Sequence, residues 1–238
     1  MTRLQRSLMG YIGFFASVCF FVAGAAAQGA RSDAEIVPVY KPPLRGAPSS
    51  RVGGGSRAIG TEMPRIYVMA PVDIGFTTKG KPDLYWFVSG TTPAKVLLTV
   101  FVDDPAKPVL EQNLVGVSAP GPQRVKLSTF SLELQPKVEY RWRITLIDES
   151  GDRTARALAG GAIQRVDAWP SLLARLKNAD KASHASVFAE EGLWYDAIEL
   201  ISESIDAAPG NLSVRKQRAG LLSQVGLTEA SNHDAGQK

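Results

Sequence analysis

Short apolar runs separated by turn residues occupy the middle of the chain. Clusters of Pro, Gly and Asp divide residues 64–166 into such runs: RIYVMA, DLYWFVSG, KVLLTVFVD, VLEQNLV, QRVKLSTF, EYRWRITLID and ALAGGAIQRV. Short runs at this spacing are typical of β-strands joined by tight turns. The pattern predicts an antiparallel β-sandwich over residues 64–166, with the KVLLTVFV strand near the centre of a sheet.

The run LQPKVEYRWRITLID alternates most regularly, which places its large apolar residues on one face of a strand. These residues are Tyr140, Trp142, Ile144 and Leu146. Its L-x-P-x-x-x-Y opening resembles the corner before the penultimate strand of fibronectin type III-like domains, where a tyrosine hydroxyl bonds to upstream backbone. The resemblance implies an immunoglobulin-like or fibronectin type III-like sandwich in which Tyr140 and Trp142 are structural.

After Val166 the apolar residues recur at intervals of three and four, which predicts helices. Residues 167–227 contain four such segments, and Pro209-Gly210-Asn211 separates the last two. The polar residues 228–238 are predicted to be disordered. The chain is therefore expected to be mainly β, with a short helical tail after the sandwich.

One part of this tail resembles a single tetratricopeptide-like repeat. The residues that match that pattern are Gly192, Trp194, Ala197, Ile201, Ser204 and Pro209. Gly192 permits a tight turn, Ala197 permits close helix packing, and Pro209 stops a helix, so these three are predicted to be structural. A solitary repeat cannot bury its own apolar face. We expect this face to pack on the sandwich or on a partner protein, which makes Trp194 a candidate partner-binding residue.

The first 27 residues have the pattern of a signal peptide. Arg3 and Arg6 precede a long apolar run, and Ala25 and Ala27 form a small-residue cleavage motif, so we expect cleavage after Ala27. A retained membrane anchor is the alternative, because the apolar run is about the minimum length that spans a bilayer. Cleavage predicts a periplasmic or secreted protein that contacts the membrane only through the removed segment.

The cysteine content excludes several kinds of chemistry. The single cysteine is Cys19, where lipidation is disfavoured because the bulky Val18 precedes it. After cleavage the chain has no thiol, so cysteine nucleophiles, cysteine metal sites and disulfides are absent. About 210 residues can bury a sufficient core without disulfides.

Residues 28–63 are rich in Pro, Gly, Ser and Arg, and we expect a flexible lead-in there. A glycine run predicts a loop, and three arginines flank it. Exposed guanidinium groups beside open backbone amides suit carboxylate or phosphate groups on a partner. The alternative is a linker whose arginines only keep it soluble. The candidate partner-binding residues are Arg45, Arg51, Gly53, Gly54, Gly55 and Arg57.

Charge is distributed unevenly along the chain. Residues 28–166 contain 18 basic and 13 acidic side chains, whereas residues 167–238 contain 7 basic and 10 acidic ones. A basic body and an acidic tail favour docking of one on the other, although two ordinary solvated surfaces explain the same numbers. The net charge of neither range is large enough to indicate a nucleic-acid partner.

No motif supports a catalytic, cofactor or metal site. GFTTKGKP (75–82) has the spacing of a phosphate-binding loop, but Pro82 and a predicted strand follow Lys81, so a turn is expected. His184 and His233 share no ligand spacing, and no G-x-S-x-G motif is present. A hydrolase with two carboxylates far apart in sequence stays open.

RGAPSSRVGGGSR, the LYWFV and YRWRI strands and the WYDAI helix together resemble the bacterial family catalogued as domain of unknown function 928. The resemblance spans about residues 38–227. Many family members carry a cysteine in the strand of Tyr140 and Trp142, which this chain lacks. The resemblance implies an exported protein, in some relatives associated with extracytoplasmic sensory systems, and it supplies no catalytic residues.

The leading hypothesis is an exported, non-enzymatic accessory protein without a cofactor that binds a protein partner in the periplasm or cell envelope. A carbohydrate- or cell-wall-binding module is the first alternative. It requires exposed aromatic side chains such as Tyr85 or Trp86 on an open sheet face. A hydrolase with dispersed carboxylates is the second alternative.

Overall fold

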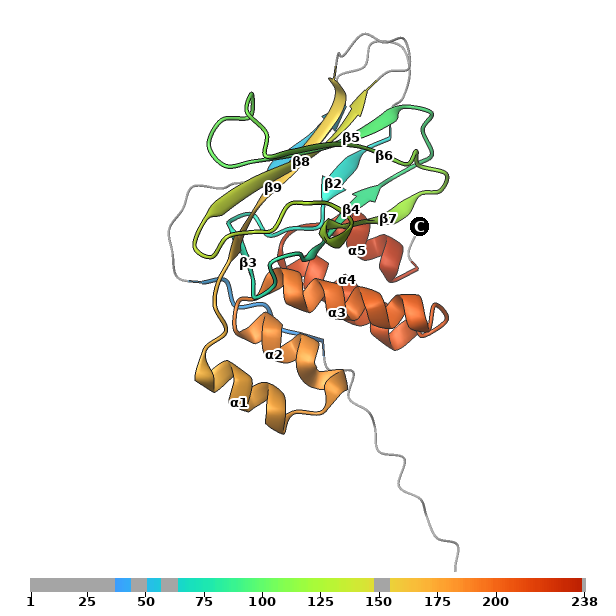
Figure 1. Ribbon diagram of the computed structural model, residues 1–238. Helices are drawn as coiled ribbons and strands as arrows, with labels where there is room; N and C mark the ends of the chain where they lie inside the picture. The colour runs from blue at the N-terminus through green and yellow to red at the C-terminus, as the bar shows by residue number, and fades with distance from the viewer. Residues whose placement is uncertain (1–36, 44–50, 57–63, 148–154, 237–238) are drawn as a thin grey trace, which may run out of the picture. The chain divides into compact units, whose positions relative to one another are not determined.

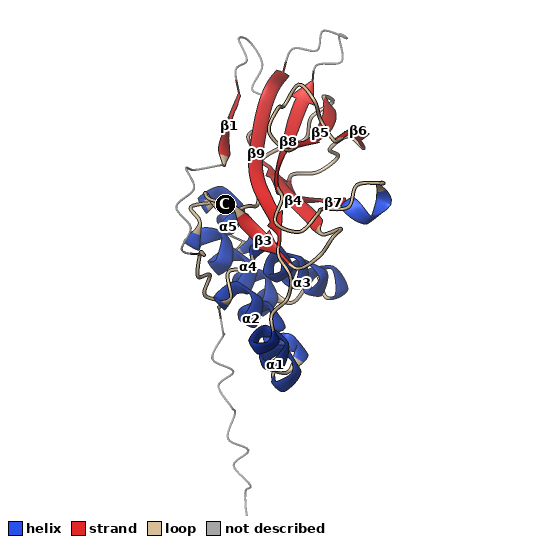
Figure 2. Cartoon of the chain, turned by 60° about the vertical axis from the view of Figure 1, so that its left-hand side comes forward, coloured by secondary structure: helices blue, strands red, loops and turns tan. Residues whose placement is uncertain are grey.

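The computed structural model describes residues 37–43, 51–56, 64–147 and 155–236. These residues form a mixed α and β structure in which two β-sheets are followed by a C-terminal cluster of helices (Figure 1, Figure 2). Within the described ranges, no helix has the length and apolar character needed to cross a membrane.

The larger sheet has the strand order β1-β9-β8-β5-β6, and β3 pairs with β9. Its strands are β1 (Val52–Ser56), β3 (Gly75–Thr77), β5 (Lys95–Phe101), β6 (Leu110–Leu114), β8 (Glu139–Ile147) and β9 (Ala155–Arg165). The smaller sheet has the order β2-β4-β7. Its strands are β2 (Ile66–Val68), β4 (Asp83–Val88) and β7 (Gly121–Lys126).

Each apolar run of the sequence contains a strand, and β5 lies inside its sheet between β8 and β6 as expected. Two strands were not predicted. β1 forms from the glycine run, and β3 forms at the start of GFTTKGKP. The pairing of β3 with β9 is parallel, whereas the other ladders are antiparallel. The described structure is therefore mixed α and β rather than mainly β, because the helices share the core with the sheets.

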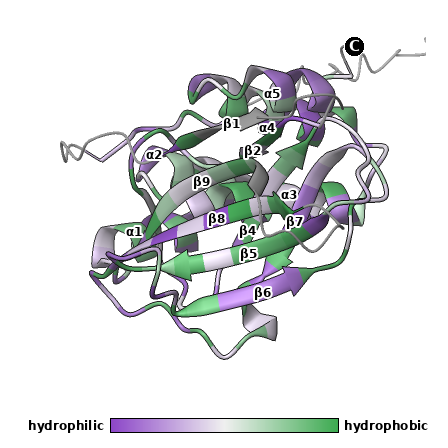
Figure 3. Cartoon of the chain, turned by 90° about the horizontal axis from the view of Figure 1, so that it is seen from above, coloured by the Kyte–Doolittle hydropathy of each residue, from purple (hydrophilic) through white to green (hydrophobic). Residues whose placement is uncertain are grey.

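Alternation along β8 places its apolar side chains in the core. Tyr140, Trp142, Ile144 and Leu146 are buried, and Arg141 on the opposite face is exposed. The backbone N–H of Gln135 donates to the Tyr140 hydroxyl at 3.2 Å, which is the expected tie across the corner. In contrast, edge strand β6 is hydrophilic along its centre (Figure 3).

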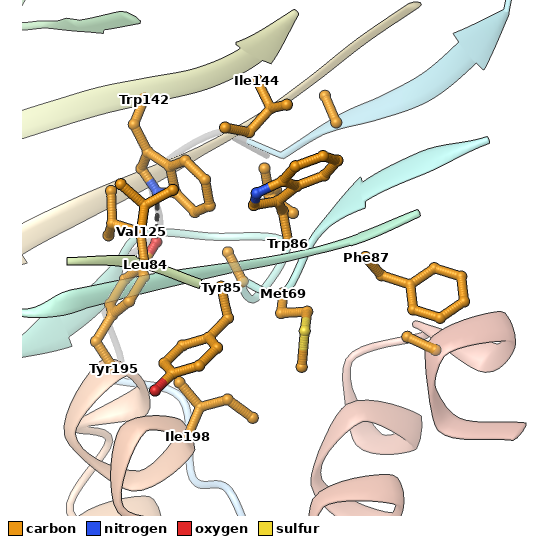
Figure 4. Close-up of a cluster of buried hydrophobic side chains, with 14 of the residues drawn as sticks. Met69, Leu84, Tyr85, Trp86, Phe87, Val125, Trp142, Ile144, Tyr195 and Ile198 are labelled. Carbon is orange, nitrogen blue, oxygen red and sulfur yellow. Dashed lines mark hydrogen bonds between the residues drawn. The ribbon is translucent and has the colours of Figure 1, made fainter. Parts of the chain in front are cut away.

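β4 is buried along its whole length because both of its faces are covered. Leu84 and Trp86 lie on one face of the strand and Asp83, Tyr85 and Phe87 on the other, and the four apolar residues belong to one core cluster. That second face lies against the helices: Phe87 contacts the ring of His233 at a centroid distance of 5.4 Å, and Tyr85 points toward α3 (Figure 4). A strand buried on both faces needs no apolar–polar alternation.

The helices are α1 (Pro170–Asn178), α2 (His184–Glu190), α3 (Trp194–Ala207), α4 (Leu212–Gln224) and α5 (Thr228–Asp234). Gly192 turns the chain between α2 and α3 with a φ of 78°, a conformation that favours glycine. After α3 ends, Pro209 leads to Asn211, whose side chain accepts the N–H groups of Ser213 and Val214 and caps α4.

Helix α5 corrects the prediction that residues 228–238 are disordered. The Asp234 carboxylate accepts from both Nε and Nη2 of Arg218 at 2.6 and 2.7 Å, and Arg218 also donates to Ser202. These groups are buried, and Ala230 packs into the core. The segment is polar in sequence, but its Asp234 forms a buried ion pair with Arg218 of α4, and local sequence patterns do not predict such a pair.

Two aromatic residues at the start of α3 join the helices to the sheets. Trp142 Nε1 of β8 donates to the Tyr195 hydroxyl at 2.9 Å, and that hydroxyl donates to the Ala162 carbonyl of β9 at 3.0 Å (Figure 4). Trp194 Nε1 donates to the Met69 carbonyl at 2.9 Å. All of these contacts are buried, so the helices dock on the sheets of their own chain.

Tyr195→Phe should lower the free energy of unfolding by about 2–4 kcal/mol, because the buried Trp142 N–H and Ala162 C=O both lose their partner. Chemical denaturation followed by tryptophan fluorescence measures the change. Tyr85→Phe is the matched control: its buried hydroxyl has no hydrogen-bond partner among the described residues, so a change within about 1 kcal/mol is expected. Equal effects of the two substitutions would contradict the bridging role of Tyr195.

Candidate functional site

Residues 37–43 form an extended segment that lies against α2, α3 and α4, and we call it the strap. It carries no helix or strand of its own and runs beside α2, blue in Figure 1. Its side chains alternate in exposure: Val37 and Val39 are exposed, whereas Pro38 and Tyr40 are buried. The helices therefore form a groove that holds an extended chain.

Main-chain hydrogen bonds fix the strap in this groove. The side-chain amide of Gln224 accepts the N–H of Tyr40 and donates to the carbonyl of Pro38, both at 2.8 Å. The N–H of Lys41 donates to the carbonyl of Ala189 at 3.1 Å. Gln224 thus pairs with the strap backbone in the way that a neighbouring strand would.

Tyr40 anchors the strap in the apolar part of the groove. Its ring meets the indole of Trp194 edge to face, with the centroids 4.9 Å apart and the planes at 77°. This arrangement is favourable between aromatic rings. Burial, together with the negative charge of Asp73, raises the pKa of the Tyr40 hydroxyl, which stays protonated at physiological pH. The groove therefore accommodates a neutral aromatic side chain.

Two glycines let the strap approach the helices closely. A Cβ atom at Gly220 would lie 2.3 Å from Cγ1 of Val37, and one at Gly192 would lie 3.0 Å from the carbonyl oxygen of Lys41. A side chain at residue 220 would therefore force Val37 to move, and one at residue 192 would crowd the backbone of Lys41. These glycines shape the groove around a chain in the position of the strap.

Next to α3 is a charged cluster formed by Lys79, Asp83, Arg124, Asp196 and Glu199. Arg124 of β7 pairs with Asp83 of β4, and Lys79 Nζ lies 2.9 Å from Glu199 Oε1. Asp196 accepts two hydrogen bonds from Thr78, from its N–H at 3.0 Å and from its hydroxyl at 2.6 Å. The three carboxylates are buried, so their pairing with β3–β4 and β7 fixes the position of α3.

Burial and ion pairing shift the pKa of three side chains in this cluster. Burial raises the pKa of Asp196 and of Glu199 because desolvation disfavours their charged forms, and the hydrogen bonds from Thr78 and Lys79 offset this only in part. For Lys79, burial acts to lower the pKa, but the hydrogen bond with Glu199 and the nearby carboxylates outweigh it and raise the pKa.

Within the described part of the chain, Asp83, Glu199 and Glu203 form a group that could hold a metal ion, since their carboxylate oxygens lie within 4.8 Å of one another. Oxygen ligands of this kind suit Ca²⁺ or Mg²⁺. However, Arg124 and Lys79 already contact all three carboxylates. The contacts therefore describe a network of ion pairs that attaches α3.

A pocket of about 360 Å³ lies between β2 and the turn from α4 to α5. Its lining residues are Arg65, Tyr67, Gly226, Leu227, Thr228, Glu229, Ala230 and Asn232. Arg65 and Glu229 pair across it at 2.9 Å, so its charged groups already neutralise each other.

Arg51 is not the exposed cation that the sequence predicts. Its Nη1 donates to the carbonyls of Val225 at 2.7 Å and Ala70 at 3.2 Å, and burial lowers its pKa. The guanidinium thus connects the β-sheets to the end of α4 and caps carbonyls there.

The glycine run forms strand β1 instead of a loop. Val52 pairs with Gly160 and Gly55 with Leu158, with an irregularity between these pairs. Gly53 and Gly54 occupy that irregular part, where glycine fits a bulged edge strand. Two other predicted partner-binding residues, Arg45 and Arg57, lie outside the described residues.

Trp194 is completely buried, so its side chain is not exposed at the surface for a partner protein to bind. It contributes to the groove through its contact with Tyr40. Ala197, also predicted to be structural, is buried on α3. Tyr85 and Trp86, the residues named above as examples for carbohydrate stacking, are buried, with 3% and 2% exposure.

Sequence reasoning missed Tyr40, Gln224 and Gly220, which lie far apart in the chain and meet only in the groove. It also missed the acids of the charged cluster. Asp196 and Glu199 do carry a local indication: they are three residues apart on α3, among apolar residues that are buried. Acidic residues inside the apolar stripe of a helix predict buried partners.

The fold and the groove define an α and β protein whose C-terminal helices pack on two sheets and hold an extended segment between them. A family model for the domain of unknown function DUF928 matches residues 52–235. The match covers well over half of the chain, which therefore belongs to this family. No curated protein matches the sequence.

Glu199→Gln should change how stability depends on pH. Because the pKa of Glu199 is raised in the folded state, ionisation costs stability as the pH increases above the ordinary value of 4.5. The difference in unfolding free energy, variant minus wild type, should therefore become more positive from about pH 4.5 to 7. Urea denaturation at several pH values measures it, with the exposed Glu111→Gln as the control for loss of a surface carboxylate. A constant difference would contradict the pKa direction.

Proposed function

We propose that this protein is an exported, non-enzymatic binding protein that engages a protein partner in the periplasm or cell envelope. The observation that carries the proposal is the groove between α2, α3 and α4, which holds the strap through backbone hydrogen bonds and a buried tyrosine. Recognition of this kind is typical of proteins that bind extended peptide segments. The amino-terminal pattern of residues 1–27 supports the exported location.

Two finer features belong to the same proposal. The sheets are proposed to form an immunoglobulin-like sandwich, supported by the corner bond between Gln135 and Tyr140. The α2–α3 pair is proposed to be a single tetratricopeptide-like unit, supported by the glycine turn at Gly192 and the small buried Ala197. Tetratricopeptide-like helices would place a peptide groove beside a rigid sheet scaffold.

Binding through the groove is tested with a peptide added in trans. In the chain of residues 28–238, Val37→Ser and Tyr40→Ser remove the side-chain anchors of the strap without changing the groove. A labelled peptide with the strap sequence VPVYKPP should bind this variant saturably in fluorescence anisotropy. Adding Gln224→Ala should weaken binding about tenfold, because two hydrogen bonds are lost.

Gln112→Ala on the exposed strand β6 is the matched control for Gln224→Ala, and it should leave peptide affinity unchanged. Two results would count against the proposed function. One is the absence of saturable binding by a variant that is folded according to circular dichroism. The other is an equal effect of the two glutamine substitutions.

A further inference from the structure

The groove and its occupant belong to different parts of the chain. The groove residues Ala189, Trp194, Gly220 and Gln224 lie within the DUF928 match, whereas the strap precedes residue 52, where the match begins. The domain that defines the family thus supplies a binding surface, and a segment upstream of that domain covers it. Because the strap is not a strand of either sheet, it can leave this surface without breaking a β-ladder.

The contacts of the strap are few and suited to exchange. Among the described residues, its polar contacts are the two bonds to Gln224, the bond from Lys41 to Ala189, and an ion pair between Lys41 and Glu190 at 4.0 Å. The Lys41 side chain of that ion pair is 64% exposed and that of Glu190 is 36% exposed, so the pair is partly solvated and weak. Tyr40 is the largest buried side chain of the strap, and Val37, although 39% exposed, packs against Gly220.

We infer that the strap is an intramolecular competitor for the groove, and that its competitor in trans is an extended protein segment carrying an aromatic residue followed by a basic one. This inference rests on the proposed function. Gln224 contacts only backbone atoms of the strap, so it accepts any extended chain in this register. Selectivity then comes from the side chains at the positions of Tyr40 and Lys41.

Each selective position has a specific counterpart in the groove. The aromatic side chain meets Trp194 edge to face, and the basic side chain lies 4.0 Å from Glu190, which also accepts a hydrogen bond from Arg175 at 2.7 Å. Prolines flank this pair in the strap, and proline restricts a chain to extended conformations before it binds, which reduces the entropy lost on binding. A partner segment with prolines around an aromatic–basic pair fits the same surface.

One chain at a time fits the groove. Val37 already occupies the space above Gly220, and the carbonyl of Lys41 lies against Gly192. A partner segment in the same register therefore has to displace the strap. Its apparent affinity is reduced by the fraction of molecules in which the strap is seated.

A reversible covalent lock tests this competition. The Cβ of Val37 lies 3.5 Å from the position of a Cβ on Gly220, within the separation of about 3.5–4.5 Å found in disulfides. Residues 28–238 contain no native cysteine, so Val37→Cys with Gly220→Cys creates a single possible intramolecular disulfide. Gly220→Cys alone is the control for the added side chain.

The probe is the labelled VPVYKPP peptide, with anisotropy as the readout. Oxidised lock protein should show no saturable binding, and reduction of the same sample should restore it. The wild type without the disulfide should have at least about tenfold lower affinity for the peptide than the Val37→Ser/Tyr40→Ser variant, because its own strap competes. Replacing the peptide tyrosine by serine should abolish saturable binding, whereas replacing its lysine by glutamate should weaken binding a few-fold at low salt.

The outcomes separate the inference from the proposed function. If the wild type binds the peptide as tightly as the Val37→Ser/Tyr40→Ser variant, the strap is no competitor, although groove binding stands. If the oxidised lock binds as well as the reduced form, the peptide binds elsewhere and the inference is overturned. If no form binds, including the Val37→Ser/Tyr40→Ser variant, the proposed function itself fails.

Discussion

The hydroxyl of Tyr195 connects three elements that are distant in sequence. It accepts from Trp142 on β8 and donates to the Ala162 carbonyl on β9, while Tyr195 itself opens α3. A buried donor or acceptor without a partner costs folding free energy, so the sheet needs this helix to satisfy Trp142. Gly75 allows the arrangement, since a Cβ there would lie 2.6 Å from the Tyr195 ring. The helices are therefore part of the core that the sheets build.

Fixing α3 in this way also creates the groove. Trp194 precedes Tyr195, and its indole is held by the Met69 carbonyl while presenting a face to Tyr40. On the opposite side of α3, the charged cluster pairs Glu199 with Lys79 and bonds Asp196 to Thr78. Apolar docking and ion pairing thus fix one helix from two directions, and the rigid surface that results can hold an extended chain with few contacts.

Several features were predictable because they depend on neighbours in the sequence. Alternation identified the buried face of β8, and the L-x-P-x-x-x-Y pattern identified the bond from Gln135 to the Tyr140 hydroxyl. The intervals of three and four after Val166 identified α1 to α4. Helix α5 was missed because Asp234 becomes a stabilising residue only when Arg218 is beside it in a buried site.

The sequence by itself determined every strand except β1 and β3, the helices α1 to α4 and the absence of cysteine after residue 27, since each depends on residue type and local spacing. Tertiary structure alone decided the roles of Arg51 and the strap. Arg51 looked like a free cation, but carbonyls of Ala70 and Val225 meet at its guanidinium. The strap looked like a flexible lead-in, but Gln224 supplies the backbone partners that its own sequence lacks. Both outcomes depend on groups brought together from opposite ends of the chain, which no local pattern encodes.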